Sequence, residues 1–333
     1  MNKQYVITSF SSEIDTSTEI ICSNIPQPDD NQILIKNEYV GINALYDREL
    51  YRGAVPYIDV IFPFVFGVEA VGIVESVGRS IKNFSVGDAV GTVKVGTAYQ
   101  EYQVVNESEA ISFPSSTPEY LAISPTGVSA DLALNLVSET KPGNTVVVSA
   151  AAGGLGHILV QLCKQKDCHV VGICGSDAKQ KMLKTLNSCD RIINYRKESI
   201  YDVLSTEYSG RIDVGFDSVG RNIFDAMIAN VAPLGRIVVM GLASELSDTQ
   251  FEKKMMARVY ESIYWKGASV RCFMNHLYRD KHAESRNKLF KMYKVGELSV
   301  KIDPTSFEGI ESINKASKYL LEGRSCGKVV VKI

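Results

Sequence analysis

The sequence has almost no net charge and no long hydrophobic run. Its Lys and Arg residues number 36 against 38 Asp and Glu, for a net charge of −2. Nucleic acid and anionic membrane are therefore not expected as main partners. The most apolar stretch, Val60 to Val74, contains Pro63 and Glu69 and is too short to span a bilayer. The first ten residues lack an apolar core, so no signal peptide is expected.

Histidine and paired cysteine are also scarce. The seven cysteines are odd in number and scattered, which argues against a disulfide framework and indicates a reducing compartment; we expect the cytoplasm. Tetrahedral zinc needs three or four placed nitrogen or sulfur ligands. The four histidines, His157, His169, His276 and His282, are not paired with cysteines at such spacing. We therefore expect no metal site.

The composition is that of a soluble globular protein, with 45% hydrophobic and 22% charged residues. A length of 333 residues suits two domains. Strand-like and helix-like pieces alternate between about Thr140 and Phe273, which predicts a parallel sheet with helices on both faces. The predicted strands have the sequences VVVSA, HVVGIC, RIINY, IDVGFDSV, GRIVVMG and ASVRCF.

The segment VVVSAAAGGLG, Val146 to Gly156, is the most informative in the chain. A buried strand is followed by a glycine-rich turn, with Ala151 in the first place of a G-x-G-x-x-G spacing, and then by a helical run, His157 to Lys166. Such a turn lets backbone N–H groups approach a pyrophosphate at a helix N-terminus. The predicted dinucleotide-binding residues of the turn are Ala152, Gly153, Gly154 and Leu155.

The remaining chain has a different pattern. Up to about Ser124 it has short strands interrupted by glycines, typical of a twisted and partly antiparallel β-fold. The apolar terminal strand, GKVVVKI, should pair in a sheet of that first domain. We expect one domain over residues 1–124 and 275–333, and a nucleotide-binding domain over 125–274.

The end of the second strand of the predicted parallel sheet bears on the choice of cofactor. NAD sites place an acid there to bind the ribose 2′-OH. Here Ser176 is followed by Lys179, and Tyr195 closes the third strand. A hydroxyl and a lysine favour a 2′-phosphate, and hence NADP(H). Asp177 comes one place later than that acid, and its alternative role is a helix cap.

The chain resembles the zinc-free quinone oxidoreductase branch of the medium-chain dehydrogenase/reductase superfamily, and within it the prostaglandin reductase 3 group. The motifs that carry the resemblance run nearly end to end: GINALYD, FGVEAVGIVESVG, VGDAVG, GTAYQEY, SAAAGGLG, GSDAKQKMLKTL, INYRKE, FDSVG, GRIVVMG, CFMNHL and GKVVV. It implies an α/β fold: a GroES-like, mostly β catalytic domain around a doubly wound Rossmann domain. Zinc-dependent relatives have a histidine where this chain has Val68.

The resemblance also implies site residues. Asn43 matches an asparagine in the catalytic and cofactor site. Tyr51 is the candidate for assisting protonation, with packing as its alternative; Tyr46 and Tyr57 share the same stretch. Ser129 matches a hydroxyl near the nicotinamide, with a helix cap as its alternative. The further positions implied to line the cofactor cleft are Ser218, Gly241, Phe273 and Gly327.

The resemblance finally implies an activity and partners. The expected reaction is NADPH-dependent reduction of the carbon–carbon double bond of an α,β-unsaturated ketone, of the 15-oxoprostaglandin type. Two alternatives stay open: an NADPH:quinone oxidoreductase, and an NADPH-binding protein with little turnover. The expected partners are a small lipophilic enone or quinone and a second copy in a homodimer. The family also occurs in peroxisomes, but this chain shows no peroxisomal signal.

Overall fold

The structure is a computed structural model that describes residues 1–245 and 259–333. By its internal contacts the chain divides into two compact units, Met1–Pro125 with Ile302–Ile333, and Thr126–Lys301. Among the described residues, no helix is long and apolar enough to cross a membrane.

The first unit is built on antiparallel strands. β15 (Val330–Lys332), β3 (Gln32–Gly41), β5 (Glu69–Val77), β6 (Ala89–Val93) and β8 (Ile111–Ser112) follow one another in one sheet, and β7 (Tyr102–Asn106) also pairs with β3. A second sheet has the order β2 (Thr18–Ser23), β1 (Asn2–Ile7), β4 (Phe64–Val65). The terminal strand β15 pairs antiparallel with β3, as its apolar sequence predicts.

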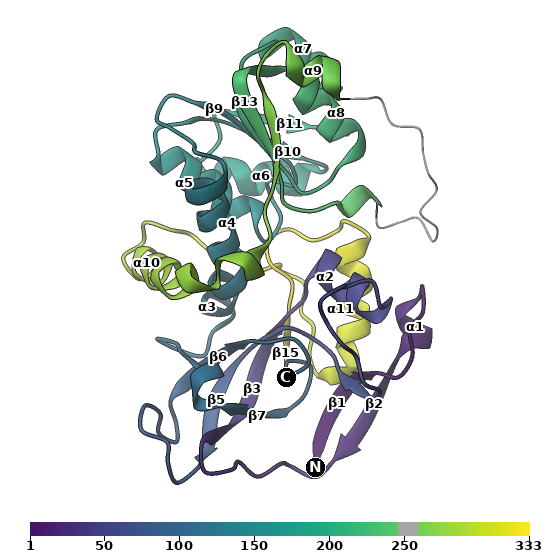
Figure 1. The fold of residues 1–333 in the computed structure, drawn as a ribbon, viewed down its shortest axis with the longest axis vertical. Helices are drawn as coiled ribbons and strands as arrows, with labels where there is room; N and C mark the ends of the chain where they lie inside the picture. The colour runs from purple at the N-terminus through teal and green to yellow at the C-terminus, as the bar shows by residue number, and fades with distance from the viewer. Residues whose placement is uncertain (246–258) are drawn as a thin grey trace. The chain divides into compact units, whose positions relative to one another are not determined.

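Short helices complete this unit: α1 (Ile14–Ser17), α2 (Ala44–Tyr51), α3 (Pro118–Ala122) and α11 (Ile313–Leu321). Its main core joins β1, β3 and α2 through Ile7, Val40 and Leu50, and α11 adds Ile313 and Ala316. Residues from both ends of the chain thus share one core (Figure 1).

The second unit holds a six-stranded parallel sheet in the order β11 (Arg191–Asn194), β10 (His169–Cys174), β9 (Thr145–Val148), β12 (Ile212–Asp217), β13 (Val231–Val239), β14 (Ser269–Cys272). All six strands are those predicted from the sequence. The strand order reverses between β9 and β12, the point at which doubly wound sheets bind ligands outside the carboxyl ends of their strands.

Helices cover both faces of this sheet. They are α5 (Gly156–Gln165), α6 (Asp177–Leu186), α7 (Ile200–Glu207) and α8 (Arg221–Ala229), followed by α9 (Tyr260–Tyr264). On one face Val147, Val171 and Ile173 pack with Leu204 of α7 and Met227 of α8. α5 lies on the opposite side, away from α7 and α8 (Figure 1). Burial on both faces explains the nearly continuous apolar strands.

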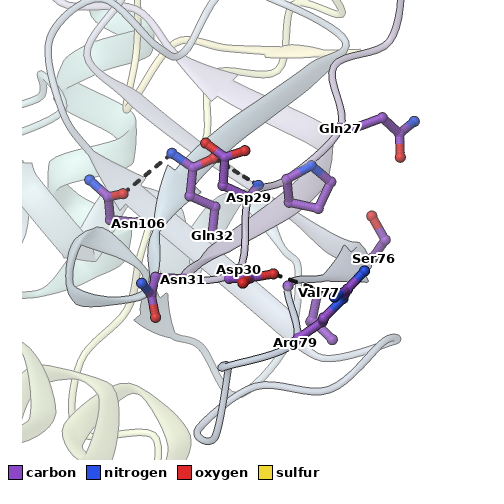
Figure 2. Close-up of a pocket in the computed structure, with 11 residues that line it drawn as sticks. Gln27, Asp29, Asp30, Asn31, Gln32, Ser76, Val77, Arg79 and Asn106 are labelled. Atoms are coloured by element: carbon purple, nitrogen blue, oxygen red, sulfur yellow. Dashed lines mark hydrogen bonds and ion pairs between the residues drawn. The ribbon is translucent and has the colours of Figure 1, made fainter.

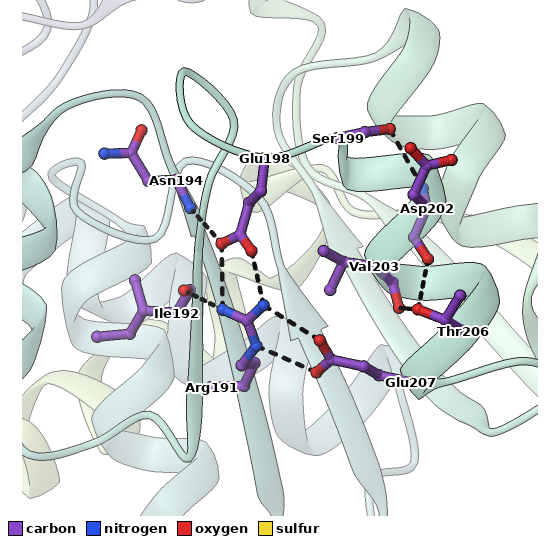
Figure 3. Close-up of polar contacts among 9 residues, drawn as sticks. All are labelled: Arg191, Ile192, Asn194, Glu198, Ser199, Asp202, Val203, Thr206 and Glu207. Carbon is purple, nitrogen blue, oxygen red and sulfur yellow. Dashed lines mark hydrogen bonds and ion pairs between the residues drawn. The ribbon is translucent and has the colours of Figure 1, made fainter.

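The outer strand β11 is tied to α7 by an ion-pair network (Figure 3). The Arg191 guanidinium contacts Glu198 at 2.7 Å and Glu207 at 3.1 Å. The two carboxylates raise the pKa of Arg191, and the Arg191 guanidinium lowers that of Glu198. The network is structural, because it braces the edge of the sheet away from the carboxyl ends of the central strands.

A further helix, α10 (His282–Lys294), follows the 3₁₀ segment Asn275–Lys281 and packs on α4 (Val128–Leu132). The buried Asp131 of α4 accepts hydrogen bonds from Ser285 at 2.7 Å and Lys288 at 2.8 Å. These contacts explain why residues 275–301 belong to the unit that holds the parallel sheet. The sequence instead predicted that they belong to the other domain, together with residues 1–124. The predicted domain boundaries stay a prediction.

Candidate functional site

The glycine turn after β9 is tight on one side and open on the other. The Gly153 N–H donates to the carbonyl of Ala150 at 2.8 Å, and Ala150 has a left-handed φ of 46°. A Cβ on Gly156 would lie 2.3 Å from that carbonyl, so only glycine lets α5 begin so close to the strand. A Cβ on Gly153 would meet only Ala150 O, at 3.2 Å. The open side of the turn therefore fits an approaching pyrophosphate.

The rest of the predicted turn lies as the spacing indicates. Ala152 is buried, while Gly153, Gly154 and Leu155 are half-buried. Leu155 is the residue before α5. The helix N-terminus thus follows the turn directly, which favours a negatively charged ligand there.

The buried side chain of His157 stabilises the turn through hydrogen bonds. The Nδ1 atom of His157 contacts Gly153 O at 2.8 Å, and its Nε2 accepts the N–H of Lys301 at 2.9 Å. Because Nε2 accepts, Nδ1 carries the proton and donates it to Gly153 O. Burial lowers the pKa of His157 to about 4, so the ring is neutral at physiological pH.

The three predicted 2′-phosphate residues lie at the carboxyl ends of β10 and β11. The Ser176 hydroxyl accepts the backbone N–H of Lys179 at 3.3 Å and caps α6. The cap is therefore Ser176, and the alternative cap role of Asp177 is wrong. Tyr195 lies against Gly175, where a Cβ would be 2.1 Å from the phenolic oxygen. Ser176 and Lys179 are half-buried and Tyr195 is 47% exposed.

The acid beside this group already has polar partners. The Asp177 carboxylate contacts the Lys197 ammonium at 2.5 Å and accepts from Asn194 Nδ2 at 3.1 Å. An acid engaged in this way is a poorer partner for a ribose 2′-OH than a free one. The arrangement favours the phosphate interpretation of Ser176, Lys179 and Tyr195.

Three more predicted residues follow β12, β13 and β14. The backbone N–H of Ser218 donates to Ser149 Oγ at 2.8 Å, and a Cβ on Gly241 would lie 3.3 Å from Ser218 O. Phe273 follows β14 and stacks on Tyr278 at 5.5 Å between ring centres. All the strand ends of the sheet therefore present predicted site residues along one edge.

Ser129 lies inside α4, not at its start, so the helix-cap alternative is wrong. Its hydroxyl accepts a hydrogen bond from Asn275 Nδ2 at 2.5 Å, and the Asn275 carbonyl is contacted by His282 Nε2 at 3.0 Å. Burial lowers the pKa of His282. The sequence did not point to Asn275, although it belongs to the quoted CFMNHL motif.

In the other unit, Asn43 belongs to a buried polar network. Its Nδ2 donates to Glu69 Oε1 at 2.8 Å and its Oδ1 accepts from Lys328 Nζ at 2.9 Å. Lys328 Nζ also donates to Glu69 Oε1 at 2.6 Å and to Ile42 O at 3.0 Å. Glu69 is fully buried and Lys328 is 3% exposed, whereas Asn43 is half-buried.

A second buried pair adjoins this network through the backbone. Asp47 Oδ2 accepts the Asn43 N–H at 2.8 Å and lies 2.6 Å from the Tyr99 hydroxyl. Burial raises the pKa of Asp47 to about 7 and that of Tyr99 well above its usual value. The tyrosine hydroxyl also lies 3.1 Å from Gly41 O, so its single proton has two acceptors. The sequence missed Lys328, Asp47 and Tyr99, although each lies in a quoted motif.

Tyr51 and Gly327 also belong to this unit. Tyr51 is 4% exposed and meets the Phe66 ring edge-on at 6.3 Å. Burial raises its pKa, which keeps the phenol protonated. Tyr46 is half-buried and Tyr57 is 41% exposed. Gly327 has a φ of 97°, a backbone conformation that favours glycine, directly before Lys328.

A catalytic zinc does not fit these residues. Across the described ranges 1–245 and 259–333, no group of three or more His, Cys, Asp or Glu is arranged to hold a metal. The position before Glu69 is Val68, and the Lys328 ammonium already neutralises the Glu69 carboxylate. A second cation beside that ammonium would be repelled.

The first unit also has a surface pocket (Figure 2). It is lined by polar side chains of the loop before β3 and of the end of β5, among them Asp29, Asp30 and Arg79. Arg79 reaches Asp30 only at 4.0 Å, and both side chains are largely exposed. None of the predicted site residues lines this pocket.

Two family descriptions match the chain. Residues 29–115 match the alcohol dehydrogenase GroES-like domain, and residues 154–279 match the zinc-binding dehydrogenase family. Prostaglandin reductase-3 of Mus musculus is 36% identical over 318 residues, which are 93% of this chain and 83% of that protein. A probable quinone oxidoreductase of Leishmania amazonensis is 30% identical, over 99% of this chain and 98% of that one. The crystal structure of CurA from Vibrio vulnificus in complex with NADPH has a TM-score of 0.86 and 25% identity, covering 99% and 98% of the two chains.

Proposed function

Because the chain belongs to the medium-chain dehydrogenase/reductase superfamily, we propose that it reduces the carbon–carbon double bond of α,β-unsaturated ketones with NADPH. The observation that carries the proposal is the site around Glu69. Where zinc-dependent relatives would polarise an alcohol or carbonyl with a metal, this chain has a buried Glu69–Lys328 pair. A hydride is then directed to an activated double bond or to a quinone rather than to a metal-bound carbonyl.

The parallel sheet supplies the residues that would hold the cofactor. Gly154 and Leu155 offer backbone N–H groups to the pyrophosphate at the start of α5, and Gly153 leaves room for it to approach. Ser176, Lys179 and Tyr195 offer a hydroxyl, a cation and a phenol to a 2′-phosphate. Ser129, Ser218, Gly241 and Phe273 are the remaining proposed contacts of this unit. Asn43 and Gly327 are the proposed contacts from the first unit.

When bound, NADPH supplies the hydride. Hydride addition to the β-carbon of an enone leaves negative charge on the carbonyl oxygen, which needs a hydrogen-bond donor. Asn43 Nδ2 has two protons and gives one to Glu69. The second is the donor that we assign to that oxygen or to the cofactor's ribose. A proton delivered to the α-carbon completes the saturated ketone, and Tyr51 is the proposed residue that assists.

Packing against Phe66 is the alternative explanation for the burial of Tyr51. The substitution Tyr51→Phe separates the two. If the phenol assists, turnover falls more than the Michaelis constant rises. If the ring only packs, both stay near the wild-type values and the hydride chemistry still stands.

The proposed substrates are lipophilic enones with a long chain, of the 15-oxoprostaglandin type. The support is the 36% identity to a prostaglandin reductase-3 over 93% of the chain. Binding energy from a remote chain holds the reacting carbon in place, so bulky enones should outperform small ones. Quinones are the second candidate, supported by the probable quinone oxidoreductase that matches nearly end to end.

Deuterium-labelled NADPH tests the reaction directly, with a 15-oxoprostaglandin and menadione as acceptors. We expect the label on the β-carbon of a saturated ketone. Label on a carbinol carbon would mean carbonyl reduction and would contradict the proposal. Faster turnover of menadione than of every enone tried would favour an NADPH:quinone oxidoreductase. NADPH binding without oxidation by any acceptor would favour a binding protein.

A further inference from the structure

Lys328, the lysine of the buried network, has contacts that determine the orientation of the Asn43 side-chain amide. An ammonium can only donate hydrogen bonds, and an ionised carboxylate can only accept them. Lys328 Nζ lies 2.9 Å from one end of the Asn43 amide, and Glu69 Oε1 lies 2.8 Å from the other. The amide oxygen must therefore face Lys328 and the amide nitrogen must face Glu69. A flipped amide would set donor against donor and acceptor against acceptor.

The burial of the three residues points the same way. Glu69 and Lys328 are buried, whereas Asn43 is half-buried. All three protons of the ammonium have acceptors, namely Ile42 O, Asn43 Oδ1 and Glu69 Oε1. The lysine thus has no proton left for a ligand, whereas Asn43 keeps one N–H. Lys328 can act on a ligand only through Asn43.

A buried ion pair is weak evidence of stability, because desolvation offsets much of its attraction. Glu69 and Lys328 lie 259 positions apart, and the pairing of β15 with β3 brings them together. What the pair adds over two apolar residues is a fixed pattern of donors and acceptors around one amide. Such a pattern preorganises a donor for the transition state.

We propose that Lys328 is a positioning residue for the reaction: it fixes the Asn43 amide so that its remaining N–H points to the ligand. The inference rests on the proposed role of Asn43 in enone or quinone reduction. Lys328 itself touches neither substrate nor cofactor in this account.

A double-mutant cycle tests whether Lys328 acts through Asn43. The variants are Lys328→Met, Asn43→Ala and both together, assayed with NADPH and the long-chain enone nonenone. We expect Lys328→Met to lower kcat about 10- to 100-fold, the range seen when a catalytic group is misplaced. In the Asn43→Ala background the same substitution should change kcat less than about twofold, because the residue it positions is gone.

A matched control separates positioning from general destabilisation. Gln103 is buried in the same unit, and its Nε2 donates to Asn37 Oδ1 at 2.6 Å. Gln103→Met removes a buried polar contact without touching Asn43, and kcat should stay at the wild-type value. If Lys328→Met does not fold, the pair Glu69→Gln with Lys328→Met removes both charges together and takes its place in the cycle.

A second measurement does not depend on turnover. The side-chain NH₂ signals of Asn43, in protein with isotope-labelled asparagine, are identified by their loss in Asn43→Ala. In wild type we expect two well-separated proton signals that exchange slowly with water; in Lys328→Met they should move together and exchange faster. Unchanged Asn43 signals would overturn the proposal, as would equal effects of Lys328→Met with and without Asn43. A wild-type protein that oxidises NADPH with neither nonenone nor menadione refutes the proposed function instead, and the amide signals then decide the positioning.

Discussion

At the residue scale, two neighbouring lysines of α6 differ in a way that bears on cofactor choice. Lys179 is half-buried, and its backbone N–H donates to the Ser176 hydroxyl at 3.3 Å. Lys181 is exposed on the same helix. A half-buried lysine that follows a capping hydroxyl is in place to offer its ammonium to a phosphate, while an exposed lysine is commonly only solvated.

Lys179→Ala should weaken NADPH binding far more than NADH binding. Loss of one charged contact to a phosphate costs about 1.5–3 kcal/mol, one to two decades in affinity. Titration of tryptophan or cofactor fluorescence measures both dissociation constants. Lys181→Ala is the control and should leave both unchanged. Equal weakening of the two cofactors, or a wild-type preference for NADH, would refute the 2′-phosphate site.

The protonation of Asp47 should change the stability of its unit between about pH 4 and pH 7. Burial raises its pKa to about 7, well above the 3.8 of an unfolded chain. The folded state therefore holds a proton that the unfolded state has lost, and this contribution to stability disappears as pH rises from about 4 through 7. Its size is at most about 4 kcal/mol.

Asp47→Asn keeps an acceptor for Tyr99 and removes the titration. We expect the unfolding free energies of wild type and variant to agree near pH 4, to diverge between pH 4 and pH 7, and to stay apart above pH 7, with the variant more stable. Urea unfolding over this range measures the difference. In Asp15→Asn the removed carboxyl has a pKa lowered by Lys318, so that variant should run parallel to wild type. Parallel curves for Asp47→Asn would show that the carboxyl is ionised throughout.

At the scale of elements, the turn between β9 and α5 uses two glycines for different reasons. Gly156 has the Ala150 carbonyl 2.3 Å from where a Cβ would be, so its glycine serves packing. Gly153 has only one neighbour, at 3.2 Å, so its glycine keeps the ligand side open. Substitution of Gly153 should therefore affect ligand binding, and substitution of Gly156 should affect stability.

Gly153→Val should abolish NADPH binding while leaving the protein folded, because the branched side chain occupies the pyrophosphate's place. Gly156→Ala should instead lower the unfolding free energy by more than about 2 kcal/mol, since a backbone carbonyl must move. Isothermal titration and urea unfolding of each variant give the two numbers. Normal NADPH affinity in Gly153→Val would remove the turn from the cofactor site.

Strands and helices of the parallel sheet were predictable because their signal is local. The helix sequence DAKQKMLKTL is α6 from end to end, and its apolar residues recur at helical spacing. The residues that follow each strand share one edge as a consequence of the parallel order. This order brings Ser176 and Tyr195, predicted from the strand ends, to the same edge as Ser218, which only the resemblance implied. The cap at Ser176 was missed because Asp177 is as good a cap by residue type, and only backbone geometry separates them.

At the scale of the whole molecule, the network around Asn43 was not predictable. Lys328 and Asn43 are 285 positions apart. The apolar terminal strand predicts a return to the first unit, but not the register that sets Lys328 against Glu69. That register follows from the pairing of Val330 with Gly41 and the left-handed Gly327. The hydrophobic pattern of a strand predicts which of its faces is buried, but not which residue of a distant strand each of its residues pairs with.

The remaining prediction is a homodimer, and it concerns β14, the edge strand of the parallel sheet. In the described part of the chain β14 pairs only with β13. Val270 of β14 is 38% exposed, and Trp265, before the strand, is 82% exposed. Nearby, Leu234 is 76% exposed, and its N–H donates to Lys266 O at 2.7 Å. An open strand edge flanked by exposed apolar side chains readily pairs with another strand.

We propose that two copies pair along β14 about a two-fold axis, which buries this edge in both at once. Light scattering after gel filtration should give about twice the 36.6 kDa of one chain. Val270→Lys places charges opposite each other at a two-fold contact and should yield monomers. Tyr201→Ser, which removes a 60% exposed aromatic of α7, is the control and should stay dimeric. A monomeric wild type at micromolar concentration, or a dimer that survives Val270→Lys, would rule out this edge as the interface.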